Sequence, residues 1–448
     1  MGKRLLQLDK IPDHIIPSLV HSLGAKFEQL SVDLPPHGPR RLADTLKASV
    51  RWALRLHDAG RAHSQELTQL NEVYSRLIAN LHDTCEELIH PPGSTDFPHE
   101  LMPAAKEWMC TFAGVDRLQT SIAFLPQWTY NYAILERGSP LNELYETISV
   151  YQPISSEIQA DFAKESAELK LPQLFYVFRF PEAESRNVLY YPMFLHEFGH
   201  AIDWNKEISD KVFESIELKF EGNDEEVSER LEIVEHWVRE FVADAIATHL
   251  GGPCLVFALW HVSLVVNVLD QDSDTHPSTR TRLALITSQL IRQGFGRKGG
   301  LGSILGFIQS QCQGALQGAC LPEYKTIRTA VLAPHVRRKI LEEVTKAFSS
   351  DCFRPHLYRT SIEDATKALH RGRPPIPKES SVVALAIVLN AAWEIALLRS
   401  DRPFQDYRAP SARHLASAFR AVSELTLKGI ESWYVRYASE RPVEQIGD

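Results

Sequence analysis

The segment His196-Glu197-Phe198-Gly199-His200 constrains the fold of this chain more than any other. Its two histidines are four residues apart, so on an α-helix they lie on one face and can share one metal ion. The glutamate beside the first histidine can act as a general base on water that the metal activates, as in HExxH zinc hydrolases. The chain must therefore fold around a helix whose histidine face is turned toward the interior.

The residues around this motif favour a buried helix. Apolar side chains occupy positions 193–195 before it and 201–202 after it. Gly199 costs roughly 1 kcal/mol relative to alanine in a helix, so its presence predicts close approach of another backbone or of substrate. The alternative is a core helix whose histidines are satisfied by hydrogen bonds alone.

Composition excludes several classes of protein. The chain has 448 residues, of which 44% are hydrophobic, which is enough for two or three subdomains with real cores. A net charge of −9 gives no electrostatic footprint for nucleic acid or an anionic membrane. The six cysteines form no CxxC pair and indicate reduced thiols of a cytoplasmic protein: Cys85, Cys110, Cys254, Cys312, Cys320 and Cys352.

No secretion signal or stable membrane insertion is expected. The first ten residues are basic at the start but lack a sustained apolar stretch. Two apolar segments, 254–269 and 382–398, are interrupted by polar residues and fall short of a clean span of about twenty residues. Both are predicted to be buried helices.

The pattern along the chain predicts a mainly α fold with a small β-sheet edge. Leucines at three- and four-residue steps predict helices over 40–88. The aromatic-rich stretch 97–170 is expected to hold shorter helices. Segments 174–180 and 187–191 are expected to be strands that lead into the HExxH helix, and nearly everything beyond it is predicted to be helical. The strand over 174–180 could bind a substrate backbone as an added β-strand.

Two glycine- or proline-rich segments suggest connections. Residues 294–302 match GxGxxG but follow a helical stretch instead of a strand, so a flexible loop is expected there. Residues 371–378 indicate an extended linker before an apolar helix. We therefore expect an N-terminal helical region over 1–168, a zincin-like metallopeptidase core over 169–292 and a C-terminal helical region over 293–448.

A catalytic zinc site needs a third protein ligand and one open position. The downstream segment Glu240-Phe241-Val242-Ala243-Asp244 places two carboxylates four residues apart on one helical face, among apolar neighbours. Glu240 is the favoured zinc ligand, and Asp244 could accept a hydrogen bond from the free nitrogen of a ligand histidine. His236, His249 or a more distant residue remain alternatives, as does an ordinary exposed acidic face.

HExxH followed by a downstream ExxxD helix resembles the gluzincin branch of the zinc metallopeptidases. Glu240-x-x-Ala243-Asp244, then 275–278 (Thr-His-Pro-Ser) and an arginine at 280 or 282, is similar to the CAAX-prenyl-protease and HtpX-like family. The resemblance covers about 195–286. It implies a helical zinc endopeptidase with these matched site residues: ligands His196, His200 and Glu240, general base Glu197, and His276 and Arg282 near the substrate oxyanion.

The chain also departs from that family. Many members carry strong membrane spans, and the terminal helical regions have no recognised counterpart. Tyr190 and Tyr191 are further candidates for the oxyanion donor. His276 could instead belong to the capping region of a helix, and Arg282 is expected to pair with the acidic loop at positions 270, 272 and 274.

The sequence thus predicts a zinc-dependent peptidase that hydrolyses protein or peptide substrates. Two alternatives stay open: a non-catalytic helical binding or scaffold protein with a structural or vestigial metal site, and a latent peptidase regulated by its own N-terminal helical region.

Overall fold

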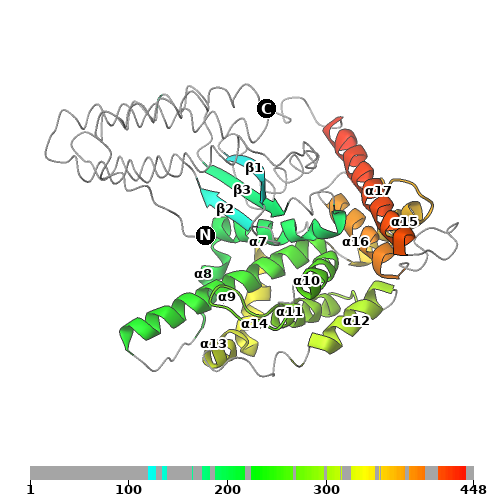
Figure 1. Cartoon of the computed structure of the whole chain (residues 1–448). Helices are drawn as coiled ribbons and strands as arrows, with labels where there is room; N and C mark the ends of the chain where they lie inside the picture. Colours follow the sequence, from blue (N-terminus) through cyan, green and yellow to red (C-terminus); the bar gives the residue numbers. More distant parts are fainter. Residues whose placement is uncertain are drawn as a thin grey trace.

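The protein is mainly α-helical (Figure 1), as expected. The computed structural model describes residues 120–127, 134–138, 164, 174–181, 187–216, 223–265, 269–296, 300–312, 314, 324–348, 353, 355–378, 383–398 and 412–439. The helices predicted over 40–88 lie outside the described residues. The predicted boundaries at 168/169 and 292/293 stay predictions.

Three strands form one mixed sheet: β1 (Thr120–Gln127), β2 (Ile134–Gly138) and β3 (Leu174–Pro181). The strand order is β1-β3-β2, with β1 parallel and β2 antiparallel to β3. β1 and β2 lie where shorter helices were expected, so that expectation is wrong for these two segments. Short apolar runs such as the one inside β1 do not distinguish strand from buried helix by periodicity.

β3 occupies the centre of this sheet. Thr120 of β1 lies opposite Leu174 on one side, and Leu135 of β2 lies opposite Phe178 on the other. Because both sides of β3 are already paired, a substrate strand cannot add to it. The prediction of substrate addition at this strand is therefore wrong.

The segment before the HExxH helix is a 3-10 turn, η4 (Val188–Tyr190), and not the expected strand. Asn187 explains the difference, because its side chain accepts a hydrogen bond from the backbone N–H of Leu189 at 3.2 Å. Such local capping offers the backbone an alternative to a sheet ladder. Pro192 then occupies the first turn of the next helix, where its missing N–H costs nothing.

Two crossing helices form the centre of the molecule (Figure 1). α7 (Pro192–Lys206) carries the HExxH motif and packs against α9 (Asp224–Gly251). A Cβ atom on Gly199 would lie 2.5 Å from the backbone oxygen of Ala243, closer than real Cβ atoms come. The predicted close backbone approach at Gly199 is confirmed, and it sets the distance between the two helices.

The termini of both helices follow from local chemistry. Asn223 caps α9 through a 2.9 Å hydrogen bond from the N–H of Glu226, and three acidic residues fill the first turn, where the helix dipole favours negative charge. α7 ends at Glu207, which adopts a left-handed conformation with φ of 53°. α8 (Ile208–Phe213) follows directly.

The described chain beyond α9 is helical. Its elements are α10 (Cys254–Val265), α11 (Thr279–Arg292), α12 (Gly300–Cys312), α13 (Lys325–Val331), α14 (Pro334–Ala347), α15 (Pro355–His370), α16 (Val383–Leu398) and α17 (Ala412–Ser439).

α10 and α16 correspond to the two apolar segments, and most of their described side chains are buried. Within the described part of the chain, we find no helix with the length and apolar character needed to cross a membrane. Asn390 of α16 donates a 2.7 Å hydrogen bond to the oxygen of Gly251, which satisfies a carbonyl group at the end of α9.

The glycine-rich segment 294–302 and the proline-rich segment 371–378 each connect two helices. The GxGxxG segment follows α11 and not a strand, whereas a dinucleotide site requires a strand before it. Its residues 300–302 form the first turn of α12, so the expected loop is wrong for these three residues. Residues 371–378 join α15 to α16 without regular structure, and Arg436 of α17 donates a 2.6 Å hydrogen bond to the oxygen of Pro377. This linker is therefore packed on α17.

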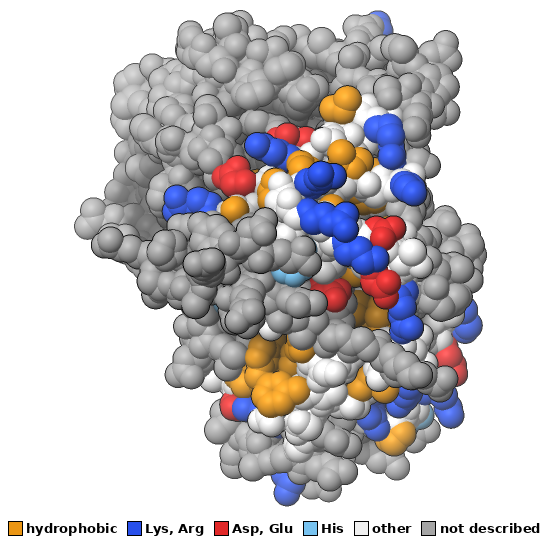
Figure 2. All heavy atoms as spheres, turned by 90° about the vertical axis from the view of Figure 1, so that its right-hand side faces the viewer, with side chains coloured by type: hydrophobic (Ala, Val, Ile, Leu, Met, Phe, Trp, Pro, Cys, Tyr) orange, Lys and Arg blue, Asp and Glu red, His pale blue; other side chains and the backbone are white. Residues whose placement is uncertain are grey.

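The central strand and the helices pack around one hydrophobic core. It contains side chains of β3, α7, α9, α10, α11, α14 and α16. On the face turned toward the viewer in Figure 2, described Lys and Arg side chains gather in a band beside acidic and apolar ones. The described part of this face is therefore not predominantly acidic, although the net charge of the chain is negative.

Candidate metal centre

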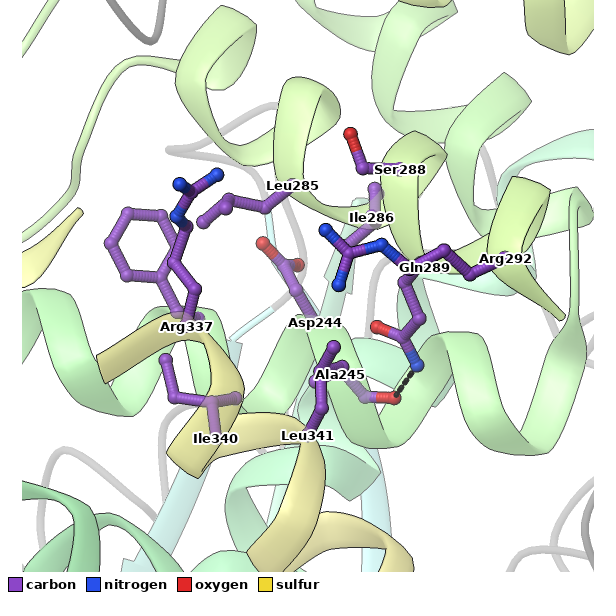
Figure 3. A pocket seen from close by; sticks show the side chains of 11 residues that line it. Asp244, Ala245, Leu285, Ile286, Ser288, Gln289, Arg292, Arg337, Ile340 and Leu341 are labelled. Carbon is purple, nitrogen blue, oxygen red and sulfur yellow. Dashed lines mark hydrogen bonds between the residues drawn. The ribbon is translucent and has the colours of Figure 1, made fainter. Parts of the chain in front are cut away.

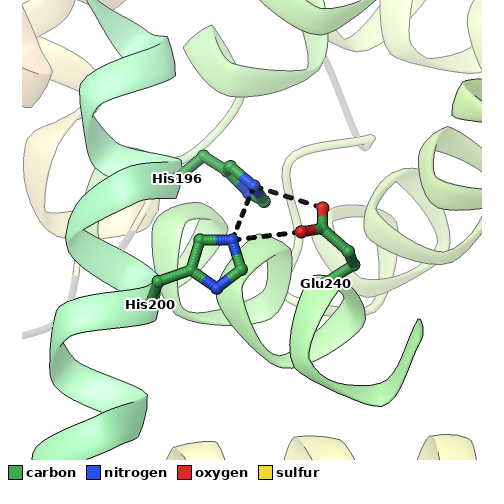
Figure 4. Close-up of side chains that lie close together, drawn as sticks. All are labelled: His196, His200 and Glu240. Atoms are coloured by element: carbon green, nitrogen blue, oxygen red, sulfur yellow. Dashed lines mark hydrogen bonds and ion pairs between the residues drawn. The ribbon is translucent and has the colours of Figure 1, made fainter. Parts of the chain in front are cut away.

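Three side chains from two helices meet at the crossing of α7 and α9 (Figure 4). His196 Nε2 and His200 Nε2, one turn apart on α7, are 3.2 Å apart. Glu240 of α9 completes the group, with Oε2 at 3.3 Å from His196 Nε2 and Oε1 at 3.2 Å from His200 Nε2. The three residues predicted as metal ligands therefore come together in space.

These atoms lie close enough together to share one metal ion. Ligand atoms at about 2.0–2.1 Å from a zinc ion, with tetrahedral angles, lie about 3.3–3.4 Å from one another. The two histidine Nε2 atoms are 3.2 Å apart, and each lies 3.2–3.3 Å from a different carboxylate oxygen of Glu240. One donor atom from each residue lies within 4.8 Å of the others, so the group could hold a metal ion.

Glu240 also contains an acceptor without a hydrogen bond. Its side chain is 7% exposed, and no hydrogen bond from a described residue reaches its buried Oε2. Arg282 Nη1 lies 3.1 Å from Oε2, close enough for an ion pair but without hydrogen-bond geometry. The charge of Oε2 is therefore balanced by Arg282, while its lone pairs remain without a hydrogen bond and could coordinate a metal ion.

Asp244 orients the first histidine. Its Oδ1 lies 2.9 Å from His196 Nδ1, and both its oxygens accept hydrogen bonds from Arg282 at 2.7 and 2.8 Å. Arg282 Nη2 also lies 3.2 Å from His196 Nδ1, but an imidazole N–H and a guanidinium cannot donate to each other. We therefore assign the hydrogen bond of the Nδ1 proton of His196 to Asp244. Nε2, which also lies 3.3 Å from Arg282 Nη2, is the nitrogen that would lose its proton to bind a metal.

Arg282 does not pair with the acidic loop, and that prediction is wrong. Arg280 makes this pair instead, with its Nε 2.5 Å and its Nη2 2.9 Å from the two carboxylate oxygens of Asp270. Residues two apart on a helix point in nearly opposite directions, so only one of the two arginines can face the interior. Arg282 is 6% exposed and faces Asp244 and Glu240.

The charges of the centre favour a cation. Burial and Arg282 lower the pKa of His196, but Glu240 and Asp244 outweigh them and raise it to about 10. Burial raises the pKa of Glu240, yet Arg282 and the surrounding histidines hold it well below its usual range. In the metal-free centre His196 therefore carries an extra proton, which a metal ion must displace. Once that proton has left, the three carboxylates of Glu197, Glu240 and Asp244 and the guanidinium of Arg282 leave a net charge of about −2, which a divalent ion balances.

Glu197 lies in the centre without belonging to the three-donor group. Its residue is 7% exposed, and its negative charge contributes to raising the pKa of Arg282, after the larger contributions of Asp244 and Glu240. Glu197 thus adds a third buried negative charge to the surroundings of Arg282.

His276 lies at the edge of the centre. Its Nε2 is 3.4 Å from Glu240 Oε1, and its side chain is 52% exposed. Glu240 raises the pKa of His276, but burial, Arg282 and the two α7 histidines outweigh it and lower the value. Ser278 is the N-cap residue of α11, so the ring of His276 does not fill that position.

The remaining candidates are not among the three donors. His236 and His249 are not part of the three-donor group in the described structure. Tyr190 and Tyr191 are 4% and 1% exposed and belong to the hydrophobic core. Sequence reasoning missed the double contact of Arg282 with Glu240 and Asp244. The sequence indicated only that Arg280 and Arg282, two residues apart, lie on opposite faces of one helix, and not which of them faces inward.

A small cavity lies between α9, α11 and α14 (Figure 3). Its volume is about 40 Å³, and it is lined by apolar residues together with Asp244, Ser288, Gln289, Arg292 and Arg337. None of the three metal-donor residues lines it. It has room for a few water molecules and not for a peptide, so it is not the substrate site.

Comparisons with known proteins give no relative for this chain: no family model matches it, and neither a curated protein nor a solved structure shows significant similarity. The function must therefore be argued from the residues of the centre.

Proposed function

We propose that this chain is a zinc-dependent peptidase that hydrolyses protein or peptide bonds. The observation that carries the proposal is the His196, His200 and Glu240 group, in which one donor atom from each residue lies within 4.8 Å of the others. Two imidazole nitrogens and one carboxylate are a donor set that suits zinc. Three protein ligands leave one position open, as catalytic zinc sites require.

The proposed roles of the chain's own residues follow from their places. A zinc ion held by the three donors would supply Lewis acidity, which polarises a carbonyl group and makes water more acidic. Glu197 takes a proton from the attacking water and returns it to the leaving amine. Asp244 holds His196 in the required tautomer, and Arg282 holds Asp244 and Glu240 in place.

The rim of the centre offers contacts for a substrate. His276 is exposed enough to touch a peptide and close enough to Glu240 to donate a hydrogen bond to a developing oxyanion. Among the described strands, β2 lies at one edge of the sheet and packs against α7. Its outer edge is a place where an extended peptide could pair beside the HExxH helix.

This arrangement supports the resemblance to the gluzincin peptidases. The HExxH helix and the ExxAD helix cross at the donor group, and the arginine of the third matched segment reaches both carboxylates. We therefore extend the proposal to a zincin-like core with endopeptidase activity.

A structural metal site is the second candidate, because His276 Nε2 is within 3.4 Å of Glu240 Oε1 and could become a fourth ligand. A closed site with four protein ligands would have no use for Glu197. In the described structure His276 is outside the three-donor group, which favours the open site.

The decisive experiment compares the wild-type chain with Glu197→Gln. We expect about one zinc ion per chain in both proteins, and a loss of peptide hydrolysis by a factor on the order of 10²–10⁴ in the variant. Glu232→Gln, an exposed change on α9, is the matched control and should keep full activity. Hydrolysis that survives Glu197→Gln but disappears with a chelator would sink the assigned mechanism.

The same proteins separate the two candidates. Four protein ligands in an X-ray absorption spectrum of the zinc-loaded chain would favour the structural site. Three protein ligands and an exchangeable oxygen would favour the peptidase.

A further inference from the structure

We propose that Thr275 is a positioning residue, which holds the ring of His276 with its proton on Nε2 and so presents an N–H donor to the metal centre. The inference rests on the proposed function, because that donor would serve the oxyanion of peptide hydrolysis. Thr275 belongs to the matched segment 275–278, but the resemblance gave it no role.

The two nitrogens of His276 have different neighbours. Nδ1 lies 2.8 Å from Thr275 Oγ1, and Nε2 lies 3.4 Å from Glu240 Oε1. A carboxylate can only accept hydrogen bonds, so Nε2 must carry the proton to interact favourably with it. A neutral imidazole has one N–H, and Nδ1 must then accept. The hydroxyl of Thr275 is placed to be the donor.

A neighbouring serine holds the backbone of His276. Ser273 Oγ lies 3.3 Å from the oxygen of His276, to which it donates, and 3.4 Å from Thr275 Oγ1. The N–H of His276 donates to Ser273 Oγ at 3.0 Å, and the N–H of Ser273 donates to the oxygen of His276 at 2.9 Å. The backbone of His276 is therefore held within a tight loop.

That loop is tied to two helices. Trp237 of α9 donates an indole N–H to the oxygen of Ser273 at 2.9 Å, and the Tyr324 hydroxyl, at the start of α13, donates to Asp274 at 2.7 Å. The rings of Trp237 and Tyr324 lie 5.7 Å apart. Trp237 is fully buried and one turn before Glu240 on the same helix, so the loop is held in register with the metal centre.

These contacts give the residues around His276 two different roles. Trp237 and Tyr324 hold the loop in place, whereas Thr275 contacts the ring and decides which nitrogen carries the proton. Changing Thr275 should therefore leave the loop folded and change the hydrogen bonding of one ring. Such a change is visible without any measurement of activity.

The experiment uses the full zinc-loaded chain with ¹⁵N-labelled histidine, in three forms: wild type, Thr275→Val and Thr275→Ser. Valine has nearly the shape of threonine without the hydroxyl, and serine keeps the hydroxyl. The His276 signals are assigned by their loss in His276→Gln. We expect the wild type and Thr275→Ser to show a proton on Nε2 and a hydrogen-bonded Nδ1, and Thr275→Val to show a free Nδ1.

Kinetics supply the second measurement. We expect Thr275→Val to lower kcat by roughly 3- to 10-fold with little change in KM, and Thr275→Ser to restore most of it. In the His276→Gln background, Thr275→Val should cause no further loss, because the ring through which it acts is gone. If Thr275 had only a structural role, Thr275→Val would lower kcat equally in the wild type and in His276→Gln.

The outcomes separate the two proposals. A wild-type His276 that carries its proton on Nδ1, or protons on both nitrogens, overturns the inference whatever the activity. The expected nitrogen signals in a wild-type chain that hydrolyses no peptide would leave the positioning of His276 intact and count against the peptidase.

Discussion

The contact between Gly199 and Ala243 predicts that a single added methyl group damages both stability and metal binding. In Gly199→Ala, the new Cβ would lie 2.5 Å from the backbone oxygen of Ala243 and 2.8 Å from its Cα. Contacts under 3.0 Å essentially never occur for real Cβ atoms, so something must move by at least about 0.5 Å. The obstacle is backbone, and α7 and α9 must therefore separate or bend.

Two opposing effects decide the stability of this variant. Replacing glycine by alanine inside a helix favours folding by about 1 kcal/mol. Forcing an extra carbon into a packed interface costs typically about 1–3 kcal/mol. Because the contact is with backbone and the site is buried, we expect the upper part of that range, and a net loss of about 1–2 kcal/mol.

The effect on metal binding should be larger than the effect on stability suggests. The two histidines flank Gly199 on α7, and Glu240 is on α9, so any separation of the helices lengthens the distances between donors. Metal sites tolerate errors of only about 0.2 Å in ligand distance. We expect zinc affinity to fall about 10- to 100-fold, the range found when ligand orientation is disturbed.

The assay is denaturant unfolding of the metal-free chain together with a competitive zinc titration. Gly306→Ala is the matched control, because Gly306 is exposed on α12 and a Cβ there would meet nothing within 4 Å. It should stabilise the protein by about 0.5–1 kcal/mol without changing zinc affinity. If Gly199→Ala behaves like Gly306→Ala in both measurements, the reasoning about the helix crossing is refuted.

Two further predictions concern buried carboxylates. Burial raises the pKa of Asp203, although Ser209 donates to its two oxygens at 2.7 and 2.6 Å. The folded state favours the protonated carboxyl of Asp203. The contribution of Asp203 to the free energy of unfolding is therefore fully present below the unfolded pKa of about 4, and it is lost as pH rises through the higher folded pKa. In Asp203→Asn the amide oxygen can accept from the N–H of Ser209, and the amide nitrogen can donate to its hydroxyl. The wild type should therefore lose stability relative to this variant from about pH 4 upward. Urea unfolding of both proteins between pH 4 and 8 checks this, and a constant difference would contradict it. Asp244→Asn should lower zinc affinity about 10- to 100-fold and the free energy of unfolding by about 3 kcal/mol, because Arg282 stays buried without its best partner. Asp270→Asn, which breaks an exposed pair, should change stability by less than about 1 kcal/mol, and an equal loss in both would count against the buried role of Asp244.

The candidate centre could be predicted from sequence because its parts obey helical periodicity. The four-residue spacing of His196 and His200, and of Glu240 and Asp244, puts each pair on one face. Apolar neighbours on both segments indicated that these faces turn inward. The same reasoning located Gly199 as a point of close approach, because a glycine inside a helix needs a reason.

Other features could not be predicted because they depend on contacts distant in sequence. Arg282 and Asp244 are 38 residues apart, and periodicity alone does not say which of two arginines on α11 faces inward. β1 and β2 are short, and their pairing with β3 is a tertiary property. The turn η4 contains residues that favour strands, but the side-chain cap from Asn187 outweighed that preference.

α9 explains why these separate contacts act together. Trp237, Glu240 and Asp244 follow one another at steps of three and four residues, so one helical face holds the loop of His276, supplies a metal donor and orients His196. α9 is capped by Asn223 at its start and receives a hydrogen bond from Asn390 at its end. Because both ends are held, a change on this face cannot be absorbed by sliding the helix, and the centre should be far more sensitive at 237–244 than at either terminus.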